Sequence, residues 1–325
     1  MAFCIVTGVA GFIGSWLAET LLSKGHEVAG IDCFTDYYSP SIKRGNIAPL
    51  LSNSRFSLHE TDLAGEARLP WSGVDYVFHL AAQPGVRTSW GAGFEPYVRN
   101  NILATQKLLE TLKNTNVRRV IFASSSSVYG LAETLPVKET EPCRPISPYG
   151  VSKLAAEQLC GTYLREFGVP IITLRFFTVY GPRQRPDMAF HKFMKCILEG
   201  RPIQIYGSGD ETRDYTFASD VVAACIACIG LDSAGQVFNI SGGSRTSLNN
   251  CIEALRRITG LPVRVERLER RSGDPRDTHA DTAKAHVALG YRPEVSLDEG
   301  LEQQWRWIRS VYESCGANAG PAAAK

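Results

Sequence analysis

The segment at residues 7–14 constrains the fold of this chain more than any other part of its sequence. It reads Thr-Gly-Val-Ala-Gly-Phe-Ile-Gly, with an apolar, strand-like run at residues 3–6 before it and a helical pattern at residues 12–24 after it. The three glycines permit, in order, a tight turn, close approach of the backbone to a pyrophosphate, and close packing of the helix on the strand. The segment therefore predicts a dinucleotide-binding corner, with the first N–H groups of the helix facing the anion. The predicted cofactor-binding residues of this corner are Gly8, Gly11, Phe12, Ile13 and Gly14.

A carboxylate follows at the distance that such a corner requires. The second predicted strand, residues 27–32, ends in Asp32, 18 residues after Gly14. A carboxylate at this position accepts hydrogen bonds from the ribose hydroxyls of adenosine. The 2′-phosphate of NADP would face Asp32 without an adjacent arginine, so the sequence predicts NAD as the cofactor.

Strand-like and helix-like segments alternate through the first half of the chain. This alternation predicts an α/β fold in which helices cover both faces of a doubly wound, parallel Rossmann sheet. Beyond about residue 177, prolines and glycines divide the chain into shorter elements, which indicates a smaller α+β lobe. The predicted strands are 3–6, 27–32, 55–59, 74–80, 117–124 and 169–175, and the predicted helices are 12–24, 96–113 and 148–167.

The 325 residues fit about two domains and a tail. Residues 1–176 are predicted to form the Rossmann domain, and residues 177–315 the substrate-binding lobe. A short apolar segment near residues 237–240 is predicted to return to the main sheet, so that the lobe interleaves with the Rossmann domain. Residues 316–325 are rich in Gly and Ala and are predicted to be a flexible tail.

The composition points to an ordinary globular enzyme. The net charge is +2, with 35 basic and 33 acidic residues, which argues against a nucleic-acid or membrane surface. The longest apolar run, residues 221–231, is too short to span a bilayer, and the N-terminus lacks the basic start of a signal peptide. The nine scattered cysteines suit a reducing, cytoplasmic location. The pair Cys225 and Cys228 lies in an apolar run and is predicted to pack in the core, so no metal site is expected.

Tyr149 and Lys153 form a Tyr-x-x-x-Lys pair at the start of a predicted helix. Residues four apart share one face of a helix, so the ammonium lies beside the phenol. A phenol has a pKa of about 10 and is a poor base at neutral pH, but the lysine and the positive nicotinamide of NAD⁺ would lower that pKa. Tyr149 could then take a proton from a sugar hydroxyl while a hydride leaves the same carbon.

A strip of four serines ends the predicted strand 117–124. It reads Ser-Ser-Ser-Ser-Val-Tyr-Gly over residues 124–130. Ligands of open α/β sheets bind outside the carboxyl ends of the strands, so these hydroxyls are expected to line the site.

Together, these motifs resemble those of the extended short-chain dehydrogenases/reductases, in particular the NAD-dependent nucleotide-sugar epimerase/dehydratase family. The matching residues are spread over nearly the whole chain. They are residues 7–14, Asp32, Asp62 and Leu63, residues 79–82, the serine strip at 124–130, Tyr149 and Lys153, residues 174–177, and Arg213 with Asp214.

The resemblance implies roles on the cofactor side. Ser125 takes the position of the catalytic hydroxyl, and Lys153 would hold the nicotinamide ribose. Asp62 and Leu63 would hold the adenine. The run that follows the fourth predicted strand adds three further cofactor contacts, Leu80, Ala81 and Ala82.

The resemblance also implies a uridine diphosphate site in the lobe. Arg213 and Arg271 match positions that grip the diphosphate, and Asp274 matches one that binds the uridine ribose. Tyr206 would line the uracil pocket. Two further substrate contacts are expected at Ala189 and Phe190.

The residues before Val-Tyr-Gly discriminate among the reactions of this family. Its dehydratases carry Asp-Glu there, and its UDP-glucuronate decarboxylases carry a Glu just before the Val. This chain has Ser126 and Ser127, which cannot supply a carboxyl proton shuttle. An epimerase needs only the tyrosine, the lysine, a hydroxyl and room for the ketone to turn, so the sequence favours an epimerase.

The run at residues 175–190 resembles that of UDP-glucuronate 4-epimerases. Thr178 stands where UDP-galactose 4-epimerases usually carry Asn. By this resemblance, Arg185 would bind the C5 carboxylate together with Ser126, Ser127 and Thr178. A planar guanidinium matches a carboxylate in a bidentate fork. The implied reaction interconverts UDP-glucuronate and UDP-galacturonate through a 4-keto sugar with NAD bound.

Three alternatives stay open at this point. The chain could be a UDP-glucuronate decarboxylase, or a neutral UDP-glucose/galactose 4-epimerase if Arg185 points away from the site. It could also be a non-catalytic NAD-binding sensor, although a sensor does not need a tuned phenol. The resemblance further implies a homodimer through helices 96–113 and 148–167. The apolar positions noted on these helices are Leu103, Leu108, Leu109, Leu112, Leu154, Ala155 and Leu159.

Overall fold

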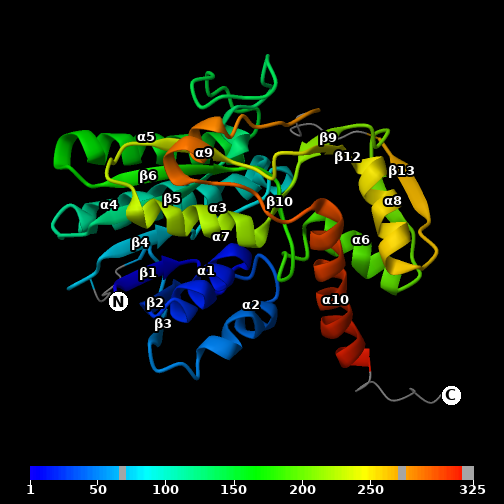
Figure 1. The fold of residues 1–325 in the computed structure, drawn as a ribbon, viewed down its shortest axis with the longest axis horizontal. Coiled ribbons are helices and arrows are strands. Elements are labelled where there is room, and N and C mark those ends of the chain that lie inside the picture. Colours follow the sequence, from blue (N-terminus) through cyan, green and yellow to red (C-terminus); the bar gives the residue numbers. More distant parts are fainter. Residues whose placement is uncertain (66–70, 270–275, 317–325) are drawn as a thin grey trace.

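A seven-stranded parallel sheet forms the centre of the fold (Figure 1). The computed structural model describes residues 1–65, 71–269 and 276–316, the last three by their backbone alone. The strand order 3-2-1-4-5-6-11 is that of a Rossmann sheet with one added strand, which confirms the predicted fold class. In this order the strands are β3 (Phe56–Glu60), β2 (Glu27–Asp32), β1 (Phe3–Thr7), β4 (Tyr76–His79), β5 (Arg119–Ser125), β6 (Ile171–Phe176) and β11 (Val237–Ile240).

The added strand β11 comes from late in the chain. It pairs in parallel with β6, with Phe238 opposite Leu174. The segment near residues 237–240 thus lies at the edge of the main sheet, where the sequence places it.

The side chains of each central strand alternate between two buried layers. On β1, Cys4 and Val6 enter one hydrophobic core, whereas Ile5 enters the other. The same alternation holds on β5, where Ile121 and Phe122 lie in different cores. Because successive side chains of a strand point to opposite faces, a strand covered on both faces must be apolar throughout.

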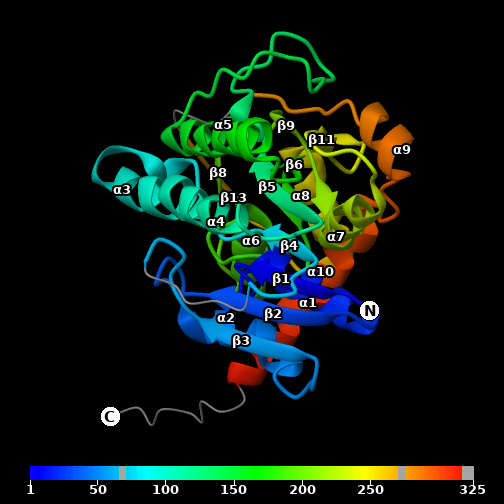
Figure 2. The same ribbon diagram turned by 90° about the vertical axis from the view of Figure 1, so that its left-hand side faces the viewer.

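Helices cover both faces of the sheet (Figure 2). One face packs on α1 (Phe12–Ser23) and α7 (Ala218–Ala227), and the other on α4 (Ala104–Leu112) and α5 (Pro148–Phe167). Ser147 caps the start of α5, where its hydroxyl accepts a hydrogen bond of 3.1 Å from Gly150 N. These bounds agree with the predicted helices 12–24 and 148–167 to within one residue.

The predicted helix 96–113 is interrupted. The structure has a short α3 (Glu95–Tyr97), a π-helical turn at Val98–Leu103 and then α4. Asn101 lies inside the π-helical turn, is buried, and bonds through its side-chain oxygen to Gln83 N at 2.6 Å. Asparagine competes with helical backbone bonding, and here a loop outside the helix recruits its amide.

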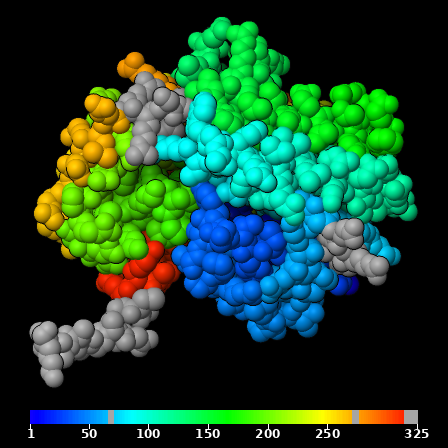
Figure 3. Space-filling view, turned by 180° about the vertical axis from the view of Figure 1, so that it is seen from behind, coloured from blue at the N-terminus to red at the C-terminus, as the bar shows by residue number. Residues whose placement is uncertain are grey.

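The remaining elements form a lobe beside the sheet (Figure 3). Its separate core is built around Phe190, Tyr215 and Trp305. Its helices are α6 (Ala189–Leu198), α8 (Leu248–Thr259) and α10 (Leu297–Gly316), and its short strands are β8 (Ile203–Tyr206), β9 (Thr212–Asp214), β12 (Arg245–Ser247) and β13 (Val265–Leu268). The pair β7 (Val179–Tyr180) and β10 (Thr216–Phe217), with α2 (Pro40–Ile47) and α9 (Ala283–Leu289), which pack on the core of the sheet, completes the α-helices and β-strands of the described residues.

Several other expectations meet the structure here. No helix among the described residues is long and apolar enough to cross a membrane. The eight cysteines of the described part are free, and Cys225 and Cys228 are buried. The predicted tail at 316–325 lies outside the described residues, except for the backbone of its first residue.

Three of the apolar positions noted on the candidate dimer helices belong to the core. Leu108, Leu109 and Leu112 are buried between α4 and the sheet. Leu103, in the π-helical turn, remains 38% exposed. Periodicity cannot separate a core face from an interface, because both are apolar stripes with the same spacing.

A buried ion pair joins α5 to β6. Arg175 donates to Glu157 through Nε at 3.0 Å and through Nη2 at 2.8 Å. Arg175 also donates from Nη1 to the Tyr129 hydroxyl at 2.8 Å, and that hydroxyl donates to Asn239 of β11 at 2.7 Å. The Ser124 hydroxyl is a further donor to Glu157. The network therefore connects the ends of β5, β6 and β11 with the helix that carries Tyr149.

We expect Glu157→Gln to lower the free energy of unfolding by about 3 to 5 kcal/mol, because Arg175 would be left buried without its counter-charge. Urea unfolding followed by circular dichroism measures this loss. Glu60→Gln is the matched control, since Glu60 pairs with Arg44 at 2.8 Å on the surface and should leave stability nearly unchanged. Equal losses in the two variants would contradict this account.

Candidate active site

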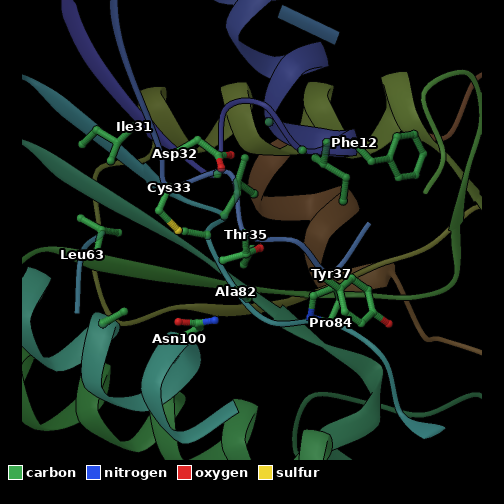
Figure 4. A pocket seen from close by; sticks show the side chains of 18 of the residues that line it. Phe12, Ile31, Asp32, Cys33, Thr35, Tyr37, Leu63, Ala82, Pro84 and Asn100 are labelled. Carbon is green, nitrogen blue, oxygen red and sulfur yellow. The ribbon is translucent and has the colours of Figure 1, made fainter. Parts of the chain in front are cut away.

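One pocket lies at the carboxyl ends of β1, β2, β4 and β5 (Figure 4). This is the edge at which an open α/β sheet binds its ligands. Arg185, predicted for the substrate, lines the same pocket. All the residues predicted for the cofactor line it as well: Gly8, Gly11, Phe12, Ile13, Gly14, Asp32, Asp62, Leu63, Leu80, Ala81, Ala82, Tyr149 and Lys153.

The glycine turn is too tight for side chains at two of its positions. Gly8 has a φ of +70°, and a Cβ there would lie 2.8 Å from Ala81 N. A Cβ on Gly14 would lie only 2.1 Å from the carbonyl oxygen of Gly8. Helix α1 therefore begins directly against the end of β1, and its first N–H groups face the pocket.

Asp32 is fixed at the end of β2 by backbone donors. Its two carboxylate oxygens accept from Ala10 N at 3.1 Å and from Phe34 N at 2.8 Å. Burial raises the pKa of Asp32, while these bonds and the nearby Lys43 oppose the rise. Figure 4 shows its carboxylate at the cavity beside Thr35, where it can accept from ribose hydroxyls. A 2′-phosphate would meet this carboxylate directly.

Lys43 is a pocket residue that the sequence did not reveal. It comes from α2, is 5% exposed, and donates to Thr35 O at 2.6 Å. Burial lowers the pKa of Lys43, while Asp32 opposes this shift. No motif marks a lysine 11 residues beyond the acid, and only the folding of α2 over the pocket brings the two together.

One buried hydroxyl fits a bound cofactor. Tyr38 lines the pocket, and its hydroxyl is buried without a hydrogen-bond partner among the residues that the structure describes. A buried polar group without a partner is costly, and a ligand group in the pocket could satisfy it. The glycine turn, Asp32 and this hydroxyl together fit a dinucleotide.

Asp62 and Leu63 lie just beyond β3, at the end of the pocket predicted for the adenine. Asp62 accepts from Ala64 N at 2.8 Å and from Arg99 Nη2 at 2.5 Å. Leu63 is buried in the layer under α4, and Figure 4 shows its side chain beside that of Cys33.

A buried histidine, His79, connects the end of β4 with β1 and with α4. Thr105 Oγ1 donates to Asn101 O at 2.6 Å, so it accepts from His79 Nε2 at 2.9 Å. Thr7 Oγ1 accepts from the backbone N–H groups of Leu80 and Ala81, both at 3.1 Å, and therefore donates to His79 Nδ1 at 2.8 Å. Burial lowers the pKa of His79 to about 3, so this imidazole is neutral. It holds the backbone that follows β4 against the end of β1.

Tyr149 and Lys153 lie on the inner face of α5. Burial lowers the pKa of Lys153 to about 8, and the charge of Glu157 limits the fall. Its ammonium lies 5.1 Å from the centre of the Phe122 ring. Burial raises the pKa of Tyr149, whereas a side-chain hydrogen bond with Ser125 and the charge of Arg185 lower it. Ser125 is thus next to the phenol, and its catalytic role stays a prediction.

The direction of the Tyr149 shift differs from the expected one. The sequence predicted a lowered pKa from Lys153 and a positive nicotinamide, but burial dominates in the protein alone. A cation beside the phenol would oppose this burial effect. A bound nicotinamide cation would therefore lower the pKa of Tyr149 from its value in the protein alone.

Asn101 is a second residue that the sequence did not single out. Its Nδ2 donates to Ser152 Oγ at 2.8 Å, and that hydroxyl donates to Tyr149 O at 2.7 Å. The π-helical turn thus fixes the backbone of the phenol. The only sign of this turn in the sequence is the adjacent pair Asn100 and Asn101 inside a helical pattern. Such π-turns occur often at functional sites.

The serines and the threonine predicted to bind the substrate carboxylate follow the carboxyl ends of two neighbouring strands. Ser125 is opposite Phe176 in the pairing of β5 with β6, so Ser126, Ser127 and Thr178 follow the ends of adjacent strands. All three are partly exposed.

The predicted uridine diphosphate residues lie in the neighbouring lobe. Tyr206 pairs with Leu268, and Arg213 Nη1 donates to Arg276 O at 2.9 Å. The Arg87 guanidinium lies 4.5 Å above the centre of the Tyr206 ring, which links the lobe to the loop after β4. The other two predicted residues, Arg271 and Asp274, lie outside the described residues.

Phe190 differs from its predicted place. Its ring is 1% exposed and packs on Tyr180 and Tyr215, with centroids 5.6 and 4.9 Å away. A ligand contact would therefore come from its backbone N–H, in the first turn of α6. Ala189, the first residue of α6, is exposed.

The comparisons agree with this fold and site. Residues 5–304 match the family model described as GDP-mannose 4,6 dehydratase. The chain belongs to this family, an extended short-chain dehydrogenase/reductase family, as its sequence predicted.

Three relatives are especially similar. A structure of UDP-glucuronic acid 4-epimerase from Bacillus cereus in complex with UDP-glucuronic acid and NAD is 43% identical, with a TM-score of 0.91 over 96% of this chain and 100% of that chain. An uncharacterized UDP-glucose epimerase of Bacillus subtilis (strain 168) is 44% identical over 95% of this chain and 98% of its own length. A UDP-glucuronate 4-epimerase of Thermodesulfobacterium geofontis (strain OPF15) is 36% identical, covering 96% and 98%.

We expect Gly14→Ala to weaken binding of NAD by about tenfold or more, because moving Gly8 O away from the new Cβ disturbs at least one hydrogen bond of the turn. Isothermal titration with NAD measures the affinity. Gly45→Ala is the control, because a Cβ at Gly45 in α2 meets no atom within 4 Å. A Gly14→Ala protein with unchanged affinity would show that the turn does not bind the dinucleotide.

Proposed function

We propose that this protein is a UDP-glucuronate 4-epimerase, which interconverts UDP-glucuronate and UDP-galacturonate with NAD bound. One observation carries the proposal: Arg185 lines the same pocket as Tyr149 and Lys153. A cation for an acid sugar is therefore next to the group that would act on its C4 hydroxyl. The similarity to the Bacillus cereus enzyme supports both the substrate and the cofactor.

Each residue of the pocket would have its own role in the reaction. Tyr149, hydrogen-bonded to Ser125, takes the proton of the C4 hydroxyl and later returns it to the other face. The glycine turn and Asp32 would hold NAD, which would supply the hydride acceptor and donor for C4. Lys153, with a pKa of about 8, stays mostly protonated at pH 7 and stabilises the phenolate. Arg213, with Arg271, would hold the diphosphate while the 4-keto sugar turns.

The serines fit a reaction that keeps the carboxylate. Oxidation at C4 of a glucuronate gives a β-keto acid, which loses CO₂ when its C–C bond aligns with the ketone. Ser126, Ser127, Thr178 and Arg185 would hold the carboxylate out of that alignment, and none of them is a carboxylic acid. We assign residues 1–176 with β11 to the NAD-binding domain and residues 177–315 to UDP-sugar binding.

A second candidate is a 4-epimerase of the neutral UDP-glucose/galactose pair. The uncharacterized relative from Bacillus subtilis, 44% identical, bears the name of a UDP-glucose epimerase and favours it. The two candidates share Tyr149, Lys153 and Ser125, and differ in whether Arg185 has a carboxylate to bind.

The first experiment is to incubate the purified protein with UDP-glucuronate, without an added redox partner, and to follow the sugars by NMR. We expect UDP-galacturonate with little CO₂, because the site holds the carboxylate but adds no acid. Tyr149→Phe, which keeps the ring and removes the hydroxyl, should abolish turnover and retain ligand binding.

Other products would overturn the proposal. A UDP-pentose with CO₂ would make the protein a decarboxylase. Conversion of UDP-glucose alone would make it a neutral-sugar epimerase. No turnover of either sugar, with ligand binding intact, would leave a non-catalytic NAD-binding sensor.

We further propose a homodimer that acts in the cytoplasm. The free cysteines of the described residues suit a reducing compartment. The π-helical turn and α5, adjacent in Figure 2, expose Val98, Leu103 and Val151 at 41, 38 and 47%. Exposed apolar side chains on neighbouring helices are typical of an interface.

We expect Leu103→Glu to convert the dimer into monomers, because a charge at the centre of an apolar interface is left without water or a partner. Sedimentation velocity at micromolar concentration measures this change. Leu261→Glu is the control: Leu261 is 41% exposed but follows α8 in the lobe. Dimers that persist in Leu103→Glu would place the interface elsewhere.

A further inference from the structure

Arg185 already has a carboxylate partner within the protein. Its Nε donates to one oxygen of Asp187 and its Nη2 to the other, each at 3.0 Å. The side chains of Arg185 and Asp187 are 19% and 31% exposed. The two residues are only two positions apart, so one short loop builds both halves of a bidentate pair.

The loop that carries this pair is anchored independently of it. Trp16 of α1 donates to Pro182 O at 2.9 Å, and the Arg183 guanidinium bonds to Glu19 at 2.7 Å. Gln184 is buried, and its side-chain oxygen accepts from His191 N at 3.0 Å. Loss of the Asp187 charge would therefore leave the course of the loop before Arg185 in place.

Asp187 is an anion at neutral pH. Burial alone would raise the pKa of Asp187, but Arg185 holds it below its usual value. The Tyr37 hydroxyl, from the loop after β2, also donates to Asp187 at 3.3 Å. The Asp187 carboxylate thus accepts from three donor groups, and the Arg185 guanidinium uses two of its five N–H groups to bond to it.

A substrate carboxylate at Arg185 would be a second anion beside the same cation. Two carboxylates near one guanidinium repel each other, and each weakens the hold of Arg185 on the other. We propose that Asp187 competes with the substrate carboxylate for Arg185 and so limits how tightly the acid sugar is held. This proposal rests on the proposed function, since it requires an acid sugar at Arg185.

Such competition suits a reaction in which the sugar must turn. Tight binding of the carboxylate in one orientation lowers KM without raising kcat, and it opposes the rotation that follows oxidation. Asp187 gives Arg185 an equivalent partner during the turn, so that no buried charge is left unpaired. Asp187 is thus a positioning residue that acts through Arg185.

The test compares affinities for an acid and a neutral sugar. In NAD-loaded Tyr149→Phe protein, which holds the sugar without turning it over, Asp187→Asn should lower the Kd for UDP-glucuronate on the order of tenfold, because Arg185 then has no internal carboxylate that competes for its N–H groups. The Kd for UDP-glucose should change by less than about twofold. With Tyr149 intact, Asp187→Asn should lower both KM and kcat for UDP-glucuronate. If the Asp187→Asn protein does not fold, Asp187→Ala provides a second variant.

Two controls isolate the pair. Glu199→Gln makes the same change in another pair of residues two apart, because Arg201 Nε donates to Glu199 at 2.8 Å on the surface, and should change neither affinity. In an Arg185→Ala background, Asp187→Asn should lose its effect on UDP-glucuronate.

Weaker or unchanged binding of UDP-glucuronate by Asp187→Asn, in a protein whose wild type converts that sugar, would overturn the competition and leave the function standing. A tightening that persists in Arg185→Ala would do the same. A wild type that neither binds nor converts UDP-glucuronate would overturn both.

Discussion

The contact between the first turn of α1 and the end of β1 is the constraint on which the rest of the site depends. No side chain fits between Gly14 and the Gly8 carbonyl, so the helix starts where the strand stops. This closeness aims the helix N-terminus at the pocket and sets α1 against the sheet. Thr7, at the end of the same strand, then fixes the backbone after β4 through His79. The cofactor side of the pocket is thus built outward from one strand end.

Buried charge is handled by local pairing throughout the site. Glu157 of α5 is close to both Lys153 and Arg175 of β6, so these three groups carry one net positive charge rather than two. Arg185 is neutralised by Asp187 in the same way. Lys153 and Arg185 each have an acidic neighbour, Glu157 and Asp187, and a buried charge without such a neighbour would be costly. Lys153 and Arg185 can therefore act on a ligand as cations while the protein keeps its buried charges compensated.

The sequence revealed the parts of the site that are encoded by spacing. The glycine turn, Asp32 and the Tyr149–Lys153 pair depend on short-range geometry, and each lies where predicted. Lys43 was missed because only the folding of α2 brings it to the site. Asp187 lies in the run 175–190 that the sequence singled out, but no repeating pattern marks its pairing with Arg185. The break in the predicted helix 96–113 was missed for a related reason: Asn101 is recruited by Gln83, a residue of another loop.

The edge strand β11 has a consequence for how the chain can be synthesised. Strand β6 ends at residue 176, but its outer hydrogen-bonding edge is covered only when residues 237–240 arrive. About 60 residues separate the two strands. Until the ribosome has added them, the nascent sheet exposes an unpaired, apolar edge of the kind that favours aggregation. Much of the smaller lobe lies in that interval. The two parts therefore cannot mature one after the other, and a protein cut at residue 176 would be left with an open sheet.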